Sequence, residues 1–350
     1  MDQISRIGMD TSKRIFQLHG VNSAEQPVLR KKLSRNAMVT FFEHLAPTVV
    51  AIEACGAAHY WSRELGRLGH TVKLIAPQLA KPYVKRGKND AADAEALCEA
   101  MSRPTMRFVP VKTAEQQAAL MLAGERERLV RQRTRLANTI RGYAGEFGLV
   151  IAKGLSHVEK LLDQLQADEA VPLLARELFA EQAADYARLQ ARIEATDARL
   201  LEWHRANPMS QRLTGVPGIG PVIASLLVMK TPDPKAFRSG RDYAAWLGLT
   251  PKDHSTAGKA KLGGITRAGD EVLRSLLVVG ATAVVWQTRR GVGRHPMPWL
   301  IKLMERKPAK LAAVALANKT ARVVWKLMTS GEAYDPTPAK PVPAAALAAA

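Results

Sequence analysis

Two aspartates lie on the face of a predicted helix that otherwise belongs to the interior. At about 100° per residue, a helix that begins at Asp90 places four side chains on one stripe: Asp90, Asp93, Leu97 and Met101. A carboxylate that leaves water is costly unless it is paired, hydrogen-bonded or bound to a metal ion. The fold must therefore bring a partner to Asp90 and Asp93.

Strand and helix signals alternate through the residues before this helix. Short apolar runs predict strands at 4–10, 14–20, 27–34, 48–54 and 71–76, and helical stretches lie at 36–45 and 57–68. The first two runs are about a turn apart, as in a hairpin, and the third could pair next. The alternation predicts an α/β domain with a mixed central sheet over residues 1–112.

The remaining sequence suggests three further parts. Residues 113–206 are helical and charged, and apolar residues spaced by seven or by three and four predict coiled-coil-like seams at 122–143 and 186–203. Those seams could close on each other or on a second subunit. Residues 207–330 form a mostly helical domain, and the Ala/Pro-rich residues 331–350 are predicted to be a disordered tail.

The net charge of +19 is concentrated in one part of the chain. Residues 205–330 contain 21 Lys and Arg against 6 Asp and Glu, whereas residues 1–204 contain 29 against 24. A basic segment joined to a nearly balanced one indicates a polyanion-binding module, with nucleic acid as the predicted partner. The alternative is a protein that is merely basic and soluble.

Signals for secretion or a membrane are missing from the sequence. The N-terminus, MDQISRIGMD, lacks the regions of a signal peptide, and no uncharged apolar run is long enough to cross a membrane. Cys55 and Cys98 are the only cysteines, so no disulfide framework is indicated, and no Cys/His cluster has zinc spacing. We therefore expect a cytoplasmic protein without a membrane partner.

Two more acids end predicted strands, Asp10 in IGMDTSK and Glu53 in VVAIEAC. If those strands are neighbours and the helix from Asp90 crosses them, four carboxylates converge. A hard divalent cation, Mg²⁺ or Mn²⁺, would neutralise the cluster. Two such ions roughly 3.5–4 Å apart can support phosphoryl transfer.

Each acid also has an ordinary structural interpretation. Asp10 could be a turn or cap residue, and Glu53 could pair with a buried Arg. Asp90 could be only the N-cap of its helix, with Asp93 complementing the helix dipole.

The basic domain begins with a Gly-rich turn, LTGVPGIGPVIASLLV. Gly218 and Gly220 suggest a helix-hairpin-helix that grips the DNA backbone without reading sequence. An ordinary tight turn between packed helices is the alternative. A flexible basic loop follows over 248–270, with four cations that could contact phosphates: Lys252, Lys259, Lys261 and Arg267. A serine is a poor nucleophile without an activating group, so these residues alone favour a hydrated Ser255.

The ordered set of motifs resembles the DEDD transposases of bacterial insertion sequences, the IS110 family. The motifs are IGMDTSK, VVAIEAC, KNDAADAEAL, GVPGIGP and LGLTPKDHSTAGKAKLGGITRAGD, and the resemblance covers nearly the whole chain except the tail. It implies a RuvC-like N-terminal domain with an RNase H-like fold. Its metal-binding tetrad falls on Asp10, Glu53, Asp90 and Asp93.

The same resemblance implies a C-terminal transposase domain whose essential serine matches Ser255. The sequence here is Ser-Thr-Ala-Gly, a small departure from the commoner motifs, so Ser255 and Thr256 both stay open as the nucleophile. Implied partners are double-stranded donor and target DNA and a structured non-coding RNA that guides their choice. The helical middle would dimerise the chain. Four chains would form the synaptic tetramer near the bacterial nucleoid, with each active site combining acids and a serine from different subunits.

These features together predict a magnesium-dependent DNA recombinase that works through a phosphoserine link. A first alternative is a structure-selective endonuclease that uses the same tetrad and water. A second is a nucleic-acid-binding protein without catalysis. A third, suggested by the Asp-Thr-Ser-Lys after the first strand, is an actin-like phosphotransferase.

Overall fold

The computed structural model describes residues 3–84, 89–256, 258–259, 261–292 and 297–336. From residue 337 onward, the predicted disordered tail lies outside the described residues. The chain divides into two compact units, residues 1–117 and 118–350. The finer division into four parts, at 1–112, 113–206, 207–330 and 331–350, stays a prediction.

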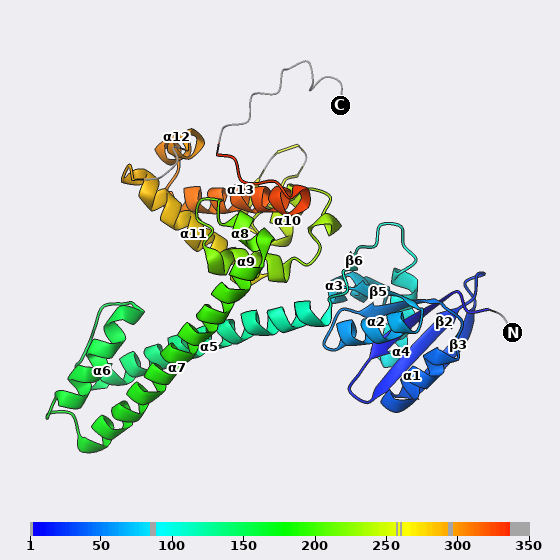
Figure 1. Ribbon diagram of the computed structural model, residues 1–350, viewed down its shortest axis with the longest axis horizontal. Helices are drawn as coiled ribbons and strands as arrows, with labels where there is room; N and C mark the ends of the chain where they lie inside the picture. Colours follow the sequence, from blue (N-terminus) through cyan, green and yellow to red (C-terminus); the bar gives the residue numbers. More distant parts are fainter. Residues whose placement is uncertain (1–2, 85–88, 257, 260, 293–296, 337–350) are drawn as a thin grey trace, which may run out of the picture. The chain divides into compact units, whose positions relative to one another are not determined.

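A six-stranded mixed sheet forms the centre of the first unit (Figure 1). Its middle strands β1, β4 and β5 are parallel, while β2, β3 and β6 join antiparallel. In sheet order the strands are β3 (Pro27–Ser34), β2 (Ile15–Val21), β1 (Arg6–Thr11), β4 (Val49–Glu53), β5 (Thr71–Ile75) and β6 (Phe108–Val109). The predicted α/β domain with a mixed sheet is confirmed, and its shape is consistent with an RNase H-like fold. The edge strand β6 has no counterpart in the sequence prediction.

Helices pack on both faces of this sheet. On one face, α1 (Arg35–Glu43) and α2 (Ala58–Arg67) bury a core that includes Ile7 and Ile52. On the other face, α4 (Asp90–Ala100) packs over β1, β2 and β4 and buries Leu97. A short helix α3 (Pro77–Ala80) and a 3₁₀ turn (Lys81–Tyr83) lie between β5 and α4. Successive residues along each strand therefore face the helices on opposite sides of the sheet.

Helix α4 contacts β1 backbone to backbone at Gly8. A Cβ atom on Gly8 would overlap the carbonyl oxygen of Ala94 and lie 2.5 Å from the amide nitrogen of Cys98. Real Cβ atoms do not approach other atoms that closely, so only glycine permits this separation. The position of α4 above the strand is therefore set by the missing side chain.

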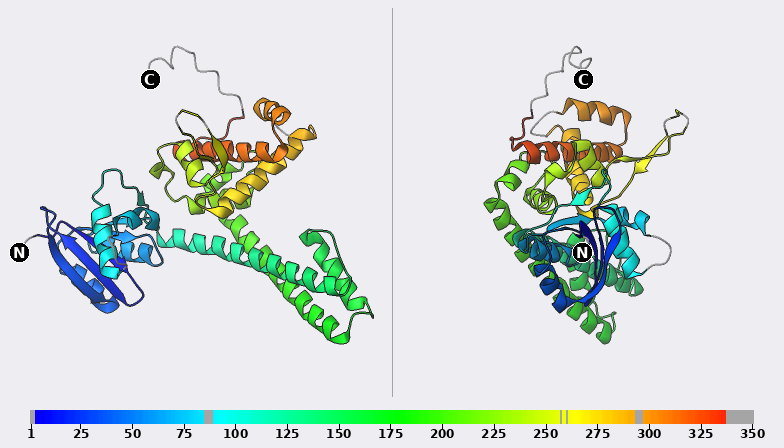
Figure 2. Two further views of the ribbon diagram at one scale, coloured as in Figure 1. Left: turned by 180° about the vertical axis from the view of Figure 1, so that it is seen from behind. Right: turned by 90° about the vertical axis from the view of Figure 1, so that its right-hand side faces the viewer.

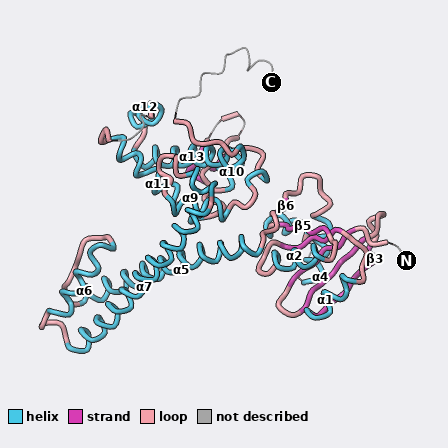
Figure 3. The backbone as a smooth tube through the Cα atoms, in the orientation of Figure 1, coloured by secondary structure: helices cyan, strands magenta, loops and turns pink. Residues whose placement is uncertain are grey.

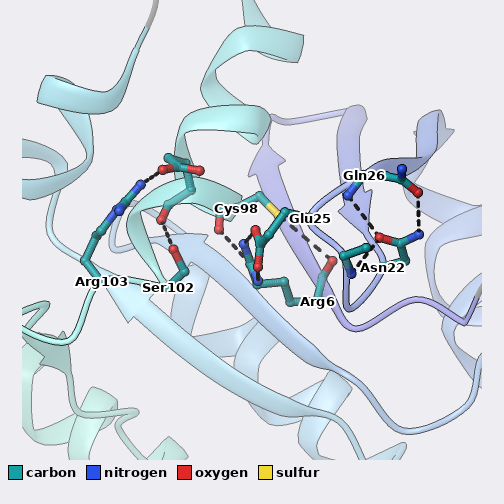
Figure 4. Close-up of polar contacts among 9 residues, drawn as sticks. Arg6, Asn22, Glu25, Gln26, Cys98, Ser102 and Arg103 are labelled. Atoms are coloured by element: carbon teal, nitrogen blue, oxygen red, sulfur yellow. Dashed lines mark hydrogen bonds and ion pairs between the residues drawn. The ribbon is translucent and has the colours of Figure 1, made fainter.

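Arg6 ties the far end of α4 to the sheet (Figure 4). Its Nε donates to the carbonyl oxygen of Cys98 at 3.1 Å, and its Nη1 donates to Glu25 in the β2–β3 turn at 2.6 Å. The carbonyl that Arg6 binds belongs to the last turn of α4, where a positive charge complements the helix dipole. Gly8 and Arg6 together fix both the height and the direction of the helix.

The second unit contains the rest of a long helix, α5 (Ala114–Glu146), which begins in the first unit. It continues through α6 (Val158–Ala167) and a second long helix, α7 (Leu173–Ala206). Arg126 of α5 donates to Asp197 of α7 at 2.5 Å, and Arg133 donates to Gln190 at 2.6 Å. The two long helices therefore contact each other within one chain. A coiled coil between subunits stays a prediction.

Within this chain, the seam predicted on α7 is buried, whereas the one predicted on α5 is buried only in part. Tyr186, Ile193 and Leu200 of α7 are buried at seven-residue spacing. On α5, Leu129 is buried, whereas Tyr143 is 55% exposed. Near its end, α5 packs against α6 and α7 through a different face that includes Ile140. The additional helix α6, which lies between the two long helices, changes the direction from which α5 is covered.

Among its described residues, the remainder of the second unit consists of helices, loops and one hairpin (Figure 3). Its core includes Tyr243, Leu277 and Leu316. The elements are α8 (Pro208–Leu213), α9 (Pro221–Lys230), a 3₁₀ turn (Pro234–Ala236), α10 (Gly240–Trp246), β7 (Pro251–Asp253), β8 (Leu262–Ile265), α11 (Glu271–Arg289), α12 (Pro298–Arg306) and α13 (Ala309–Ser330). The prediction of a mostly helical remainder is confirmed. Within the described part of the chain, no helix is both long and apolar enough to span a membrane.

We expect Gly8→Ala to destabilise the first unit by about 1–3 kcal/mol, because the added methyl group forces α4 away from β1. Urea denaturation monitored by circular dichroism measures the change. Gly66→Ala is the matched control, since Gly66 lies in α2 and its Cβ position has no atom within 4 Å. That variant should be neutral or up to about 1 kcal/mol more stable. Equal effects of the two substitutions would contradict the close-contact explanation.

Candidate metal centre and serine hairpin

Asp10 and Glu53 lie next to each other on parallel strands. Met9 of β1 pairs with Ile52 of β4, and the following residue on each strand is one of the two acids. Met9 and Ile52 are buried against α1 and α2. Because side chains alternate along a strand, Asp10 and Glu53 both face the α4 side of the sheet. Both carboxylates are half-buried.

The first turn of α4 carries the other two acids. The Asn89 side chain accepts a hydrogen bond from the Ala92 amide at 2.8 Å, so Asn89 is the N-cap. The alternative interpretation of Asp90 as the N-cap is therefore wrong. Asp93 is half-buried, but Asp90 is exposed, so the expectation that both point into the interior holds only for Asp93. Along this face of α4, the first fully buried member is Leu97, one turn after Asp93. The first turn lies beside the ends of β1 and β4, which carry Asp10 and Glu53.

Three of the four acids line one pocket of about 820 Å³: Asp10, Glu53 and Asp93. Asp90 does not line it. Lys81 and Gln78, from the segment between β5 and α4, complete its polar wall. Neither was predicted as a site residue, and the available signal was their place directly after a buried strand. In the part of the chain that the structure describes, no three Asp, Glu, His or Cys side chains already have the mutual spacing of a metal-ligand shell.

The acids affect each other electrostatically. The pKa of Asp10 is raised from 3.8 to about 6, first by burial and then by the negative charges of Asp90, Asp93 and Glu53. Repulsion of this kind acts only between charges that are close in a medium of reduced dielectric constant. Asp90 therefore belongs electrostatically to the same group although it does not line the pocket.

The donor set suits a hard divalent cation. Carboxylate oxygens are the ligands that Mg²⁺ and Mn²⁺ prefer, and the pocket gathers them from two strands and a helix. A cation would also relieve the burial and repulsion that raise the pKa of Asp10. The residues present fit a metal ion on both grounds.

Ser255 lies beyond the end of β7 in a hairpin with an anchored base. A Cβ on Gly248 would overlap the Ala268 carbonyl oxygen, and one on Gly269 would overlap that of Trp246, so backbone packs tightly there. From this base the hairpin extends away from the helices of its own unit (Figure 2, right view). The described residues near its tip, including Ser255, are exposed.

The Ser255 side chain has fixed partners despite its exposure. Its Oγ accepts a hydrogen bond from the Lys261 amide at 3.0 Å. Its own amide donates to Oδ1 of Asp253 at 2.8 Å. A hydrogen bond from the Ser255 hydroxyl is the main reason why the pKa of Asp253 lies below its ordinary value. Asp253 was not predicted, because an ordinary acid in a basic loop gives no sequence signal.

The predicted phosphate-binding cations lie on the same loop as this serine, with Lys261 opposite Ser255 and Arg267 at the base of the hairpin. Lys252, Lys259, Lys261 and Arg267 are all exposed, and their side chains form no ion pair with any described residue. Charges that are not neutralised within the protein remain available to a polyanion. The described geometry is compatible with phosphate contact, which stays a prediction.

The Gly-rich turn lies between α8 and α9, as the sequence predicts. Gly218 has φ +84°, and a Cβ there would lie 2.8 Å from the carbonyl oxygen of Gly280 in α11. Packing thus requires a glycine at position 218. This requirement agrees with the alternative interpretation, an ordinary tight turn between packed helices. Gly220, the N-cap of α9, has no atom within 4 Å of its Cβ position, which leaves the start of α9 accessible. A helix-hairpin-helix function stays a prediction.

Comparison with known proteins identifies two matching families. Residues 7–146 match the DEDD transposase family of IS110 elements, and residues 210–294 match the family described as Transposase IS116/IS110/IS902. The first range contains the four acids, and the second contains Ser255 and the Gly-rich turn.

Similar full-length proteins are transposases from several bacteria. A putative transposase of Sinorhizobium fredii, y4pF/y4sB, is 66% identical over 95% of this chain and 86% of its own length. A probable family 20 transposase of Pseudomonas aeruginosa is 48% identical over 95% of this chain and 99% of its own. The transposase for insertion sequence element IS1111A of Coxiella burnetii is 37% identical over 95% and 92%, respectively.

In metal-free protein, we expect the free energy of unfolding to fall as the pH rises from 3.8 toward about 6. The native state holds the Asp10 proton in this window while the unfolded state releases it, so a rising pH favours unfolding. Two pKa units correspond to about 3 kcal/mol, and the half-exposed position reduces this to on the order of 1 kcal/mol. Urea titrations in chelator measure the slope, which Asp10→Asn should flatten. An unchanged slope would contradict the assignment to Asp10.

We expect Mg²⁺ to raise the thermal unfolding temperature of the wild type at neutral pH. Binding to the native state alone stabilises it by roughly 2.7 kcal/mol at one hundred times the Kd. Asp93→Asn should lose most of this increase while raising the metal-free stability, because one repulsive charge is gone. Glu99→Gln is the control on the same helix, since Glu99 pairs with Arg103 instead. An equal Mg²⁺ response in both variants would exclude Asp93 as a ligand.

Proposed function

Since this chain belongs to the IS116/IS110/IS902 family of insertion-sequence transposases, we propose that it exchanges DNA strands through a covalent link to Ser255. The metal-dependent part of the proposal rests on the adjacency of Asp10 and Glu53 on β1 and β4, opposite Asp93 of α4. The serine link is supported by the exposed Ser255 hydroxyl, which the Lys261 amide holds in a basic hairpin. Enzymatic cleavage and joining of DNA follow from the family. The serine link, the roles of the residues and the guide RNA are the proposed additions.

A DEDD domain implies dependence on a divalent metal ion. Asp10, Glu53 and Asp93 would hold it from the pocket walls, with Asp90 as a further ligand from the first turn of α4. We propose Mg²⁺ or Mn²⁺, with two ions. When bound, such ions polarise a phosphoryl oxygen and stabilise the charge that develops in phosphoryl transfer.

Ser255 supplies the nucleophilic oxygen in this mechanism. Its Oγ attacks a backbone phosphorus, the bond from phosphorus to the 3′-oxygen breaks, and the serine proton is released. The products are a phosphoserine ester and a free 3′-hydroxyl. The ester retains a phosphodiester-like bond, so attack by a second 3′-hydroxyl can rejoin strands without ATP. Thr256, the neighbouring hydroxyl, is the alternative nucleophile.

The basic part of the chain would hold the DNA in place. The exposed cations Lys252, Lys259, Lys261 and Arg267 would contact phosphates near the serine, and the turn at Gly218 and Gly220 would contact the backbone as a helix-hairpin-helix. Such binding releases counterions, so the affinity should fall steeply with salt.

Further partners are proposed from the family resemblance. A structured non-coding RNA of the element would choose donor and target DNA by base pairing, while the protein supplies the chemistry. The exposed parts of α5 and α7 would dimerise the chain, and a tetramer would form on paired DNA ends.

The second candidate function is hydrolytic cleavage by a RuvC-like endonuclease. It is favoured by the acid pocket, which provides metal ligands without any need for Ser255. Family membership speaks against the non-catalytic and phosphotransferase alternatives. Only the serine mechanism produces a protein–DNA adduct.

We expect Ser255→Ala to abolish covalent adducts, because it removes the attacking oxygen. Full-length protein is purified from cells that transcribe the whole element and is incubated with Mg²⁺ and a labelled plasmid carrying that element. Denaturing gels then measure labelled protein, and mass spectrometry of the digested adduct locates the phosphorylated residue. Thr256→Ala should retain adduct formation. Strand cleavage by Ser255→Ala at the wild-type rate, with no adduct in the wild type, would favour the hydrolytic alternative.

A further inference from the structure

Asp253 and Ser255 form a pair at the end of β7 that no other part of the site explains. The Asp253 carboxylate accepts the Ser255 amide at 2.8 Å, and an interaction with the hydroxyl of the same serine lowers the pKa of Asp253. The Lys261 amide occupies a lone pair of Ser255 Oγ from the opposite strand of the hairpin. With one donor fixed on the oxygen, a lone pair remains for a phosphorus atom, and the Asp253 carboxylate on the Ser255 amide is the neighbouring acceptor for the hydroxyl proton.

His254, the other possible proton acceptor nearby, does not take part in this arrangement. Its ring lies beside Gly263, with ring atoms 3.4 Å from the position of a Cβ on that glycine. Among the described residues no hydrogen bond joins the His254 ring to Ser255. The carboxylate of Asp253 is therefore the group in position to receive the serine proton.

An amide bond from residue i+2 to an aspartate also occurs in ordinary turns, and this chain contains such a case. Asp233 accepts the Lys235 amide at 2.9 Å without any neighbouring hydroxyl. The two sites share this backbone hydrogen bond but differ in the hydroxyl. Comparing Asp233 with Asp253 therefore distinguishes an aspartate that only stabilises a turn from one that also takes part in proton transfer.

We propose that Asp253 is a catalytic residue that orients the Ser255 hydroxyl and accepts its proton as the oxygen attacks DNA. The inference rests on the proposed role of Ser255. As the Oγ–phosphorus bond forms, the Oγ–H bond breaks and the proton passes to the carboxylate. The bond from phosphorus to the 3′-oxygen breaks, and the leaving oxygen takes a proton from water. Aspartate has a comparable role toward the substrate hydroxyl in protein kinases.

The pKa of Asp253 lies below its ordinary value in the free protein, which keeps the carboxylate ionised and ready to accept a proton. A DNA phosphate beside it would oppose that shift, because like charges raise the pKa of an acid. Binding of the substrate therefore strengthens Asp253 as a base at the point where it is needed.

The test compares Asp253→Asn with Asp233→Asn in the adduct assay described above. The amide side chain introduced by Asp253→Asn can still accept the Ser255 amide, so the turn is retained, but it cannot take up a proton. We expect the rate of adduct formation in this variant to fall by roughly 10²–10⁴-fold, the usual contribution of a general base. Plasmid binding and thermal stability should stay at wild-type values. Asp253→Glu should recover part of the rate, and Asp233→Asn should be unchanged.

The pH dependence distinguishes proton transfer from positioning alone. In Asp253→Asn, hydroxide must replace the carboxylate, so the ratio of wild-type to variant rate should shrink as the pH rises. A ratio that is constant with pH, or a variant with the wild-type rate, would overturn the inference while leaving the serine mechanism intact. Absence of a Ser255 adduct in the wild type would instead overturn the proposed function, and this inference with it.

Discussion

The contact between α4 and β1 at Gly8 determines the geometry of the acid pocket. Without a side chain at this position, the helix backbone lies directly on the strand, and Arg6 fixes its last turn through the Cys98 carbonyl. The first turn, with Asp93, then lies over the strand ends that carry Asp10 and Glu53. A carboxylate side chain is short, so its position depends almost entirely on the backbone that carries it. The packing of one glycine therefore decides whether acids from three elements can act together.

Electrostatics divides the work between the two units. In residues 1–117, carboxylates share a half-buried pocket and repel each other, as the raised pKa of Asp10 shows. Such a pocket repels DNA until its charge is neutralised. In residues 118–350, exposed cations that form no ion pair with any described residue lie on the loop that carries Ser255. The basic loop of the chain thus attracts the phosphate backbone of DNA. The acid pocket repels that backbone unless a cation neutralises the carboxylates.

Much of the first unit could be predicted because its signals are local. Alternating apolar runs predict β1 to β5, and an acid inside an apolar run, as at Glu53, marks a strand end. The exposure of Asp90 could not be predicted, because it depends on where α4 starts relative to the ends of β1 and β4. Lys81 enters the pocket through the path of the chain after β5, which no periodicity encodes. Tyr143 is exposed because α6 changes the packing partners of α5. Asp253 becomes notable only once the hairpin backbone places its carboxylate on the amide of Ser255.

The meeting of Gly218 with Gly280 has a consequence for how this protein can vary. Each residue presents its carbonyl oxygen to the place where the other would carry a methyl group. Neither glycine has a side chain that could be made smaller. A larger residue at one position therefore cannot be compensated by a substitution at the other. The two positions, 62 residues apart in the chain, are therefore a linked pair. A loop transplanted from a homologue into residues 214–220 would fit only if it also has a glycine at the position that contacts α11.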